Sequence, residues 1–103
     1  MQTLQVLQEG ATLKKELVVQ NRSGIHARVS TMIAQRCKGF ASTIRLRNGS
    51  AVADCRSVLD LLSLGAANGT TLWLEATGED AAEALKTITA LFEARFNEDD
   101  ESL

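Results

Sequence analysis

The sequence predicts an α+β domain in which four strands form one antiparallel sheet and three helices cover one of its faces. Segments with the two-residue period of strands alternate along the chain with segments that have the 3.6-residue period of helices. Asn48-Gly49 lies between two strand-like runs and is a strong hairpin signal. A chain of 103 residues with 45% hydrophobic residues is also large enough for one core.

The first half of the predicted domain contains a strand, a helix and a hairpin. Residues 13–20 alternate as a strand, and a turn cluster at 21–24 follows. Residues 27–37 are expected to form a helix that ends at Lys38-Gly39. Its stripe faces the core and consists of Ser30, Ile33, Ala34 and Cys37. The hairpin strands are expected at 42–47 and 50–53.

The second half is expected to add a short helix, a strand and a long helix. Ser57 and Asp60 resemble a capping box that opens a helix over 58–64. Residues 70–77 alternate as the fourth strand. Asp80 and Glu83 are expected to cap and charge the start of the final helix. The buried stripe of that helix is predicted to be Ala84, Leu85, Ile88, Leu91 and Phe92.

We divide the chain into an N-terminal extension at 1–12, one domain at 13–97 and an acidic tail at 98–103. The end of the chain from residue 97 is expected to fray. Trp73 should lie on the uncovered face of the sheet, exposed beside Arg45. The alternative is that Leu4, Val6 or Leu7 of the extension folds over it.

Composition excludes several classes of function. The net charge is -2 and the basic residues are scattered, which argues against nucleic acid as a partner. No run approaches the roughly 18 apolar residues of a membrane span, and the first ten residues do not resemble a signal peptide. We therefore expect a cytoplasmic protein. Cys37 and Cys55 form no zinc motif, and whether they pair in a disulfide stays open. No metal or other cofactor is expected.

His26, the single histidine, lies in Ser23-Gly24-Ile25-His26-Ala27-Arg28, where a turn meets a helix. The first N–H groups of a helix point outward without internal partners and attract anions. A ring nitrogen of His26 could there attack phosphorus, while the N–H groups of Ala27 or Arg28 and the Arg28 guanidinium bind the phosphoryl oxygens. Gly24 would permit the tight turn. The alternative is a structural histidine that caps the helix.

Two segments resemble the histidine-containing phosphocarrier protein family, HPr. Residues 24–28 are similar to its active-site signature, and residues 56–65 to its regulatory-serine segment and second helix. The similarity continues through 66–70 and 75–80 and covers about residues 14–96. This resemblance implies an open-faced β-sandwich and a phosphoryl carrier of the bacterial sugar phosphotransferase system (PTS), which is a substrate of enzymes and not itself an enzyme.

The resemblance also implies roles for individual residues. His26 would accept a phosphoryl group on Nδ1 from phospho-Enzyme I and pass it to an EIIA-type domain, with Arg28 stabilising it. Ser57 would be the regulatory serine of HPr kinase/phosphorylase, in bacteria that have that enzyme; the alternative is a plain helix cap. An exposed patch would dock the partners, unless one or more of its residues belongs to the core. Its members are Ala27, Val58, Leu59 and Leu62.

One departure from the family stands beside the site. The family usually has proline directly after the arginine, and this chain has Val29. Valine puts the efficiency of transfer in question and is compatible with a regulatory phosphorelay. A second hypothesis is a regulatory binding protein controlled through Ser57 and protein contacts, with little phosphoryl transfer on His26 and little role in sugar transport. A hydrolase lacks support, because no nucleophile or orienting carboxylate is close to His26 in sequence, although folding could bring one close. A monomer is expected.

Overall fold

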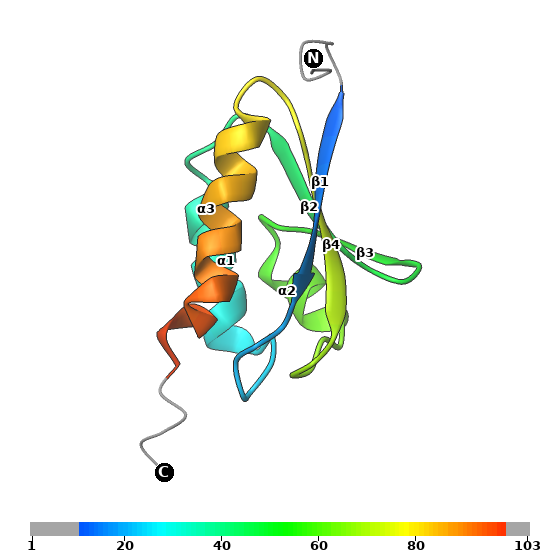
Figure 1. Cartoon of the computed structure of the whole chain (residues 1–103), viewed down its shortest axis with the longest axis vertical. Coiled ribbons are helices and arrows are strands. Elements are labelled where there is room, and N and C mark those ends of the chain that lie inside the picture. The colour runs from blue at the N-terminus through cyan, green and yellow to red at the C-terminus, as the bar shows by residue number, and fades with distance from the viewer. Residues whose placement is uncertain (1–10, 99–103) are drawn as a thin grey trace.

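The computed structural model describes residues 11–98 and shows one sheet backed by helices (Figure 1). All paired strands are antiparallel, in the order β1-β4-β2-β3. The predicted fold class is therefore confirmed. The strands are β1 (Thr12–Val18), β2 (Thr43–Asn48), β3 (Ala51–Asp54) and β4 (Thr71–Thr77).

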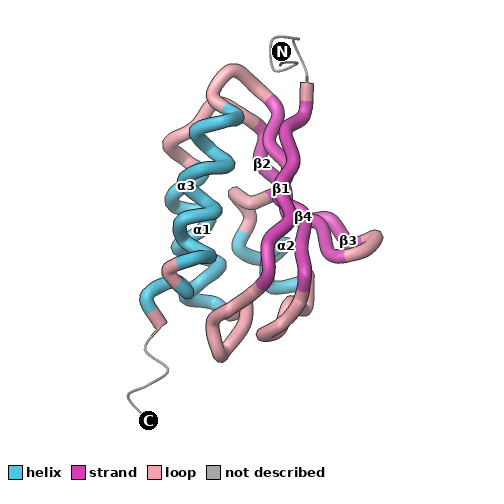
Figure 2. The backbone as a smooth tube through the Cα atoms, in the orientation of Figure 1, coloured by secondary structure: helices cyan, strands magenta, loops and turns pink. Residues whose placement is uncertain are grey.

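The helices lie together on one side of the sheet, and the other side is left open (Figure 2). They are α1 (Ala27–Cys37), α2 (Val58–Ser63) and α3 (Ala81–Glu93), followed by the short 3-10 helix η2 (Arg95–Asn97). The bounds of α1 are those predicted from its apolar stripe. The strands and α2 differ from the predicted ranges by one or two residues at their ends, where periodicity carries least information.

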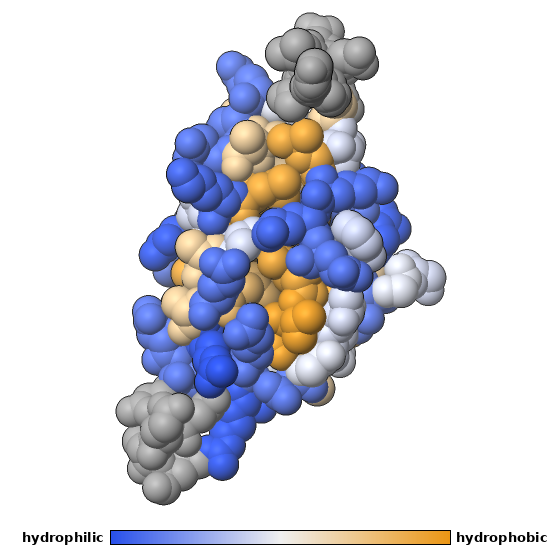
Figure 3. All heavy atoms as spheres, viewed as in Figure 1, coloured by the Kyte–Doolittle hydropathy of each residue, from blue (hydrophilic) through white to orange (hydrophobic). Residues whose placement is uncertain are grey.

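The core lies between the helices and the inward faces of the strands. Apolar side chains gather where α3 meets the sheet (Figure 3). The predicted stripe of α1 is buried and also includes Val29. The stripe of α3 is buried except for Leu85, which is partly exposed. Each side chain follows the period of its element, and this is why the sequence pattern located the core.

Asp80 does not cap α3 as predicted. Its carboxylate instead accepts hydrogen bonds from the backbone N–H groups of Ala41 and Ser42, at 2.8 and 2.9 Å, and from the Ser42 hydroxyl. These hydrogen bonds lower the pKa of Asp80, and the bond from the Ser42 hydroxyl has the largest effect. Gly78 permits this contact, because a Cβ atom there would lie 2.6 Å from Ser42 Oγ. Asp80 thus joins the start of α3 to the start of β2.

The predicted capping box at α2 is half formed. The Ser57 hydroxyl accepts a hydrogen bond from the Asp60 N–H at 3.1 Å, as a cap does. The reciprocal bond of the box is absent, because the Asp60 carboxylate accepts from the N–H of Asp54 instead. Ser57 is therefore a structural N-cap, whatever else it does.

Other predictions have mixed outcomes. Cys37 and Cys55 are buried free thiols, so the disulfide left open by the sequence is not formed. Trp73 lies on the open sheet face and is 43% exposed, but its cross-strand neighbour is Arg47 and not Arg45. The contacts proposed for Leu4, Val6 and Leu7 lie outside the described residues.

None of the helices in residues 11–98 is long and apolar enough to cross a membrane.

Candidate functional site

The turn between β1 and α1 brings His26 to the surface beside the loop that follows α2. Gly24 has φ +72°, and a Cβ atom there would lie 2.7 Å from the carbonyl oxygen of Ala66 and 2.9 Å from the Cα atom of Ala67. The next residue, Ile25, donates its N–H to the Ala66 carbonyl at 2.9 Å. Only glycine fits this close approach, so Gly24 fixes where the following histidine stands.

Asn21 stabilises the same turn from inside. Its side chain is fully buried and donates to the Gly24 carbonyl at 2.7 Å. The N–H of Gly24 in turn donates to the Asn21 carbonyl at 3.2 Å. Sequence reasoning treated this asparagine only as part of a turn cluster. Its position at the start of that cluster is the signal, since asparagine side chains bond to backbone groups a few residues on.

His26 is the N-cap residue of α1 through its backbone alone. Its backbone is extended, and its carbonyl accepts the N–H of Ser30 at 2.8 Å, which begins the helix. The imidazole makes no capping bond, and its side chain is 34% exposed. The alternative of a histidine that caps the helix is therefore met by its backbone, while its side chain takes no part in the cap. The N–H groups of Ala27 and Arg28 make no hydrogen bond within residues 11–98 and remain as donors at the helix start.

Folding brings Glu98 to His26. One carboxylate oxygen lies 3.0 Å from Nε2 of the imidazole, and the other accepts the Ser23 N–H at 2.8 Å. The amide of Asn21 lies 3.4 Å from the same carboxylate. These hydrogen bonds lower the pKa of Glu98 to about 2, and the largest contribution comes from the Ser23 N–H, followed by His26 and Asn21. Sequence reasoning missed this residue. Its expectation of a frayed end from residue 97 is wrong for Glu98, and residues 99–103 lie outside the described part of the chain.

A left-handed turn carries the chain from α3 to His26. Arg95, Phe96 and Asn97 have φ angles of 54°, 52° and 58°, a conformation that costs roughly 1–2 kcal/mol for each L-residue. The Phe96 ring is buried and packs edge to face on Phe92, with ring centroids 4.8 Å apart. This burial offsets the strain and anchors the segment that presents Glu98.

Arg28 joins the same cluster from the first turn of α1. Its guanidinium donates to the Phe96 carbonyl at 3.1 Å and lies 3.7 Å from the Glu98 carboxylate. The side chain is 49% exposed, so the cation is available to a ligand from solvent. His26, Arg28 and Glu98 therefore form one site from both ends of the chain, and the sequence predicted the first two.

The remaining predicted residues lie on α2 or beside it. Val58 is half-buried, while Leu59 and Leu62 are 76% and 38% exposed, and Ala27 on α1 is also exposed. None of these four is buried, so the alternative that one or more is core is wrong. Ser57 has no hydrogen bond to His26, Arg28 or Glu98. The described residues also contain no group of three or more His, Cys, Asp or Glu side chains that could hold a metal ion.

Comparison with known proteins identifies the family. The family model "PTS HPr component phosphorylation site" matches residues 13–94. Phosphocarrier protein NPr of Escherichia coli K12 is 37% identical over 89 residues, which are 85% of this chain and 99% of that protein. Phosphocarrier protein HPr of Xylella fastidiosa strain 9a5c is 34% identical over 87 residues, covering 84% and 98%.

A solved structure agrees with these relatives. HPr-C-His from Thermoanaerobacter tengcongensis superposes with a TM-score of 0.81 at 29% identity, covering 84% of this chain and 98% of that one. The chain therefore belongs to the HPr family of PTS phosphocarrier proteins. It is a carrier of phosphoryl groups and not an enzyme, as the resemblance in its sequence implied.

Proposed function

We propose that His26 is the residue that carries the phosphoryl group, on Nδ1. The observation that supports this assignment is the engagement of Nε2 with Glu98, at 3.0 Å. Within residues 11–98 no hydrogen bond involves Nδ1, and the ring is partly exposed at a helix N-terminus. A ring nitrogen with a lone pair, on a partly exposed side chain at the start of a helix, suits nucleophilic attack on phosphorus.

The neighbours of His26 suit the product of that attack. A new N–P bond would form at Nδ1 while the phosphorus–nitrogen bond of the donor breaks, and the donor nitrogen keeps that electron pair. The phosphoryl oxygens would then accept from the N–H groups of Ala27 and Arg28. Arg28 would add a permanent positive charge, which is the usual partner of phosphate oxygens.

The partners we propose are those that the family implies. Phospho-Enzyme I would supply the phosphoryl group from phosphoenolpyruvate, and an EIIA-type domain of the sugar phosphotransferase system would receive it. The exposed patch formed by Ala27, Val58, Leu59 and Leu62 would dock both partners in turn. A patch of this kind suits a brief encounter between relay proteins. We propose a cytoplasmic monomer, with residues 13–97 as the carrier domain between an N-terminal extension and an acidic tail.

Ser57 is the residue through which a second, regulatory function would act. We propose it as the site for an HPr kinase/phosphorylase in an organism that has this enzyme. Its hydroxyl is half-exposed at the N-terminus of α2, where a phosphate is tolerated electrostatically. A phosphate there would add negative charge directly beside Val58 of the docking patch and weaken docking to acidic surfaces.

The carrier function is tested by intact-mass analysis after incubation with phosphoenolpyruvate and Enzyme I. One phosphoryl group (~80 Da) should be gained and then lost in acid. His26→Ala should gain nothing, while Arg28→Ala should gain it more slowly by on the order of a hundredfold. No gain on the unaltered chain would refute the proposal and direct the same assay to Ser57 with ATP and the kinase.

A further inference from the structure

We propose that Glu98 is a positioning residue for phosphoryl transfer: it binds the Nε2–H of His26, turns Nδ1 toward the partner, and holds the ring proton while Nδ1 carries phosphate. This inference rests on the proposed role of His26. It adds a residue that acts through the imidazole and does not itself touch the phosphoryl group.

The protonation state of Glu98 fixes which atom donates in the bond to His26. The pKa of Glu98 is lowered to about 2, chiefly by the Ser23 N–H. At neutral pH the carboxylate can therefore only accept hydrogen bonds. Since the Nε2–Oε2 distance is 3.0 Å, Nε2 must carry the proton. Nδ1 of a neutral ring is then left with the lone pair that attack on phosphorus requires.

The geometry of the imidazole keeps the Glu98 carboxylate apart from a phosphoryl group on Nδ1. The two nitrogens of an imidazole lie on different sides of the ring, so a phosphoryl group on Nδ1 points away from a carboxylate at Nε2. The carboxylate is also held by Ser23 at 2.8 Å and by Asn21 at 3.4 Å, and its side chain is only 15% exposed. Glu98 can therefore stay in place when the phosphoryl group arrives.

A ring proton held at Nε2 matters for onward transfer. When a partner attacks phosphorus, the N–P bond breaks and its electron pair returns to Nδ1. If Nε2 still carries its proton, the leaving group is neutral imidazole; without the proton it is a much poorer anionic leaving group. The negative charge of Glu98 favours the protonated phosphorylated ring. Arg28 opposes this effect, but its charge is shared between Glu98, 3.7 Å away, and the phosphoryl oxygens that it is proposed to bind.

The path of the chain supports a positional role. Three consecutive L-residues, 95–97, adopt left-handed backbone angles immediately before Glu98. Strain of this kind persists where the surrounding structure specifies it and is common at functional sites. Here the left-handed conformation is held in place by the buried Phe96 ring and by the hydrogen bonds of Glu98. A solvated chain end would not require such a conformation.

The test is the lifetime of the phosphorylated protein, together with the rate of transfer to an EIIA domain. Phosphohistidine is hydrolysed through its protonated ring, so Glu98→Ala should make the phosphoryl group longer-lived at pH 8, by up to about tenfold. The same change should slow onward transfer by a similar factor. Glu98→Asp should recover part of both effects, while Glu98→Gln, which lacks the charge, should resemble Glu98→Ala. Glu93→Gln, an exposed carboxylate at the end of α3, is the matched control and should behave as the unaltered chain.

The measured lifetimes and transfer rates distinguish a positioning role of Glu98 from a purely structural role and from a blocking role. If Glu98 were only structural, its loss would loosen the turn, and the phosphoryl group would be shorter-lived. If Glu98 blocked the site, Glu98→Ala would be phosphorylated and would transfer faster. Either result overturns the inference. If the unaltered chain is phosphorylated at another residue or not at all, the assignment of His26 fails first, and that failure is visible without any Glu98 variant.

Discussion

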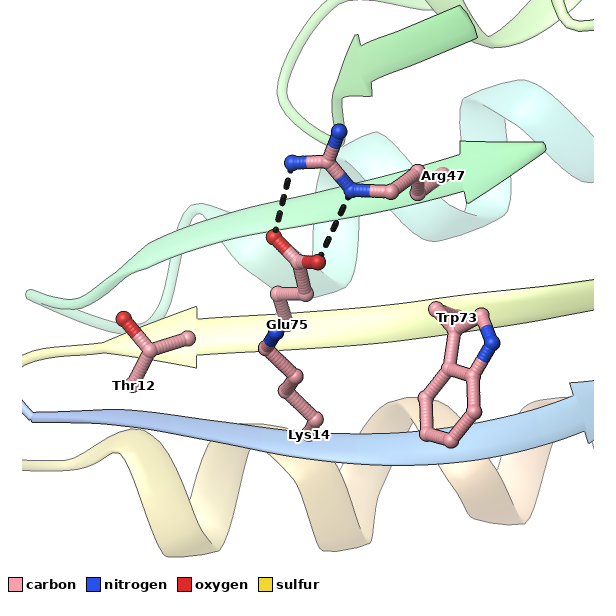
Figure 4. A pocket seen from close by; sticks show the side chains of 5 residues that line it. All are labelled: Thr12, Lys14, Arg47, Trp73 and Glu75. Atoms are coloured by element: carbon pink, nitrogen blue, oxygen red, sulfur yellow. Dashed lines mark hydrogen bonds and ion pairs between the residues drawn. The ribbon is translucent and has the colours of Figure 1, made fainter. Parts of the chain in front are cut away.

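The guanidinium of Arg47 and the carboxylate of Glu75 form a two-point ion pair across β2 and β4, with N–O distances of 2.9 and 3.3 Å. The pair lies beside Trp73 on the open sheet face, in a hollow that Thr12 and Lys14 also line (Figure 4). Glu75 is only 8% exposed, and the Arg47 hydrogen bond lowers the pKa of its carboxyl group. The sheet therefore contains a nearly buried charge whose main partner is Arg47, while the nearby charges of Lys14 and Arg45 lower its pKa by smaller amounts.

Replacing Arg47 with Met should destabilise the fold by about 1–3 kcal/mol, because the Glu75 carboxylate loses its partner but stays buried. Urea unfolding at pH 7 measures this difference. The folded pKa of Glu75 is lowered, so its contribution is complete above the unfolded value of about 4.3 and is lost as the pH falls through the folded value. The difference between the two proteins should therefore shrink in acid.

Arg45→Met is the matched control for this ion pair. Arg45 lies opposite Glu75 in register, but it is exposed and makes no hydrogen bond to it within the described residues. Its charge also lowers the pKa of Glu75, but less than Arg47 does. Its replacement should therefore destabilise the fold by less than about 1 kcal/mol, and by less than the replacement of Arg47. An equal loss in both variants, or a loss at Arg47 that does not shrink as the pH falls below the unfolded pKa of Glu75, would show that the paired charge is not the cause.

The sequence predicted the elements and two of the three clustered side chains, His26 and Arg28, because the relevant signals are local. The stripe of α1, bounded by a turn cluster and a glycine, determines that helix, and the turn-to-helix junction marks His26. Alternation placed Trp73 on the open face, but the face alone does not give the register, so Arg45 was expected where Arg47 lies.

The contacts that the sequence did not predict join residues that are far apart along the chain. Glu98 reaches His26 through a left-handed turn at 95–97, and none of its residues is glycine, so no local pattern predicts it. Asp80 has the spacing of a cap, but a pair of backbone N–H groups 38 and 39 residues away competes for its carboxylate. In both cases tertiary contacts override the local preference of the residue.

Gly24→Ala should damage both the fold and the site. Its Cβ atom would meet backbone atoms of Ala66 and Ala67 at 2.7 and 2.9 Å, and its φ of +72° is strained for alanine. The loss should exceed about 2 kcal/mol. Gly49→Ala is the control, because its φ of +61° carries the same strain with nothing within 4 Å of the new atom. Thermal unfolding of both variants should give the larger loss at Gly24, and equal losses would refute the steric argument.

The thiols of Cys37 and Cys55 should not react in the folded protein. Both thiols are fully buried. The pKa of Cys55 is raised by its hydrogen bond with Cys37 and by burial. A disulfide reagent at pH 8 should therefore modify neither thiol until urea unfolds the chain. A cysteine introduced as Ser50→Cys in the exposed hairpin turn supplies the positive control. Rapid native-state modification of two thiols in the unaltered chain would contradict this prediction.

Trp73 reports whether residues 1–10 cover the open sheet face. If Leu4, Val6 or Leu7 packs on the indole, deleting residues 1–10 should shift its emission to longer wavelength, because the ring becomes more exposed to water. The deletion stops before Thr12, where β1 begins. A full-length variant with serine at all three positions should reproduce the shift. An unchanged spectrum in both would leave Trp73 simply solvent-exposed.

Val29→Pro should restore the family residue at the site without loss of the fold. The first bond of α1 runs from the Ser30 N–H to the His26 carbonyl, so the N–H of Val29 is not needed by the helix, and proline is tolerated in a first turn. Stability should change by less than about 1 kcal/mol, and phosphorylation should persist, because Ala27 and Arg28 keep their N–H groups.

Ser30→Pro provides the contrast, because it removes the first bond of α1 and should destabilise the helix by about 3 kcal/mol or more. Circular dichroism shows whether each variant keeps its helices, and the mass assay with Enzyme I shows whether it is phosphorylated. A folded Val29→Pro protein that is no longer phosphorylated would identify the Val29 N–H as a phosphate donor that proline cannot supply. The site would then use three backbone donors where proline leaves two.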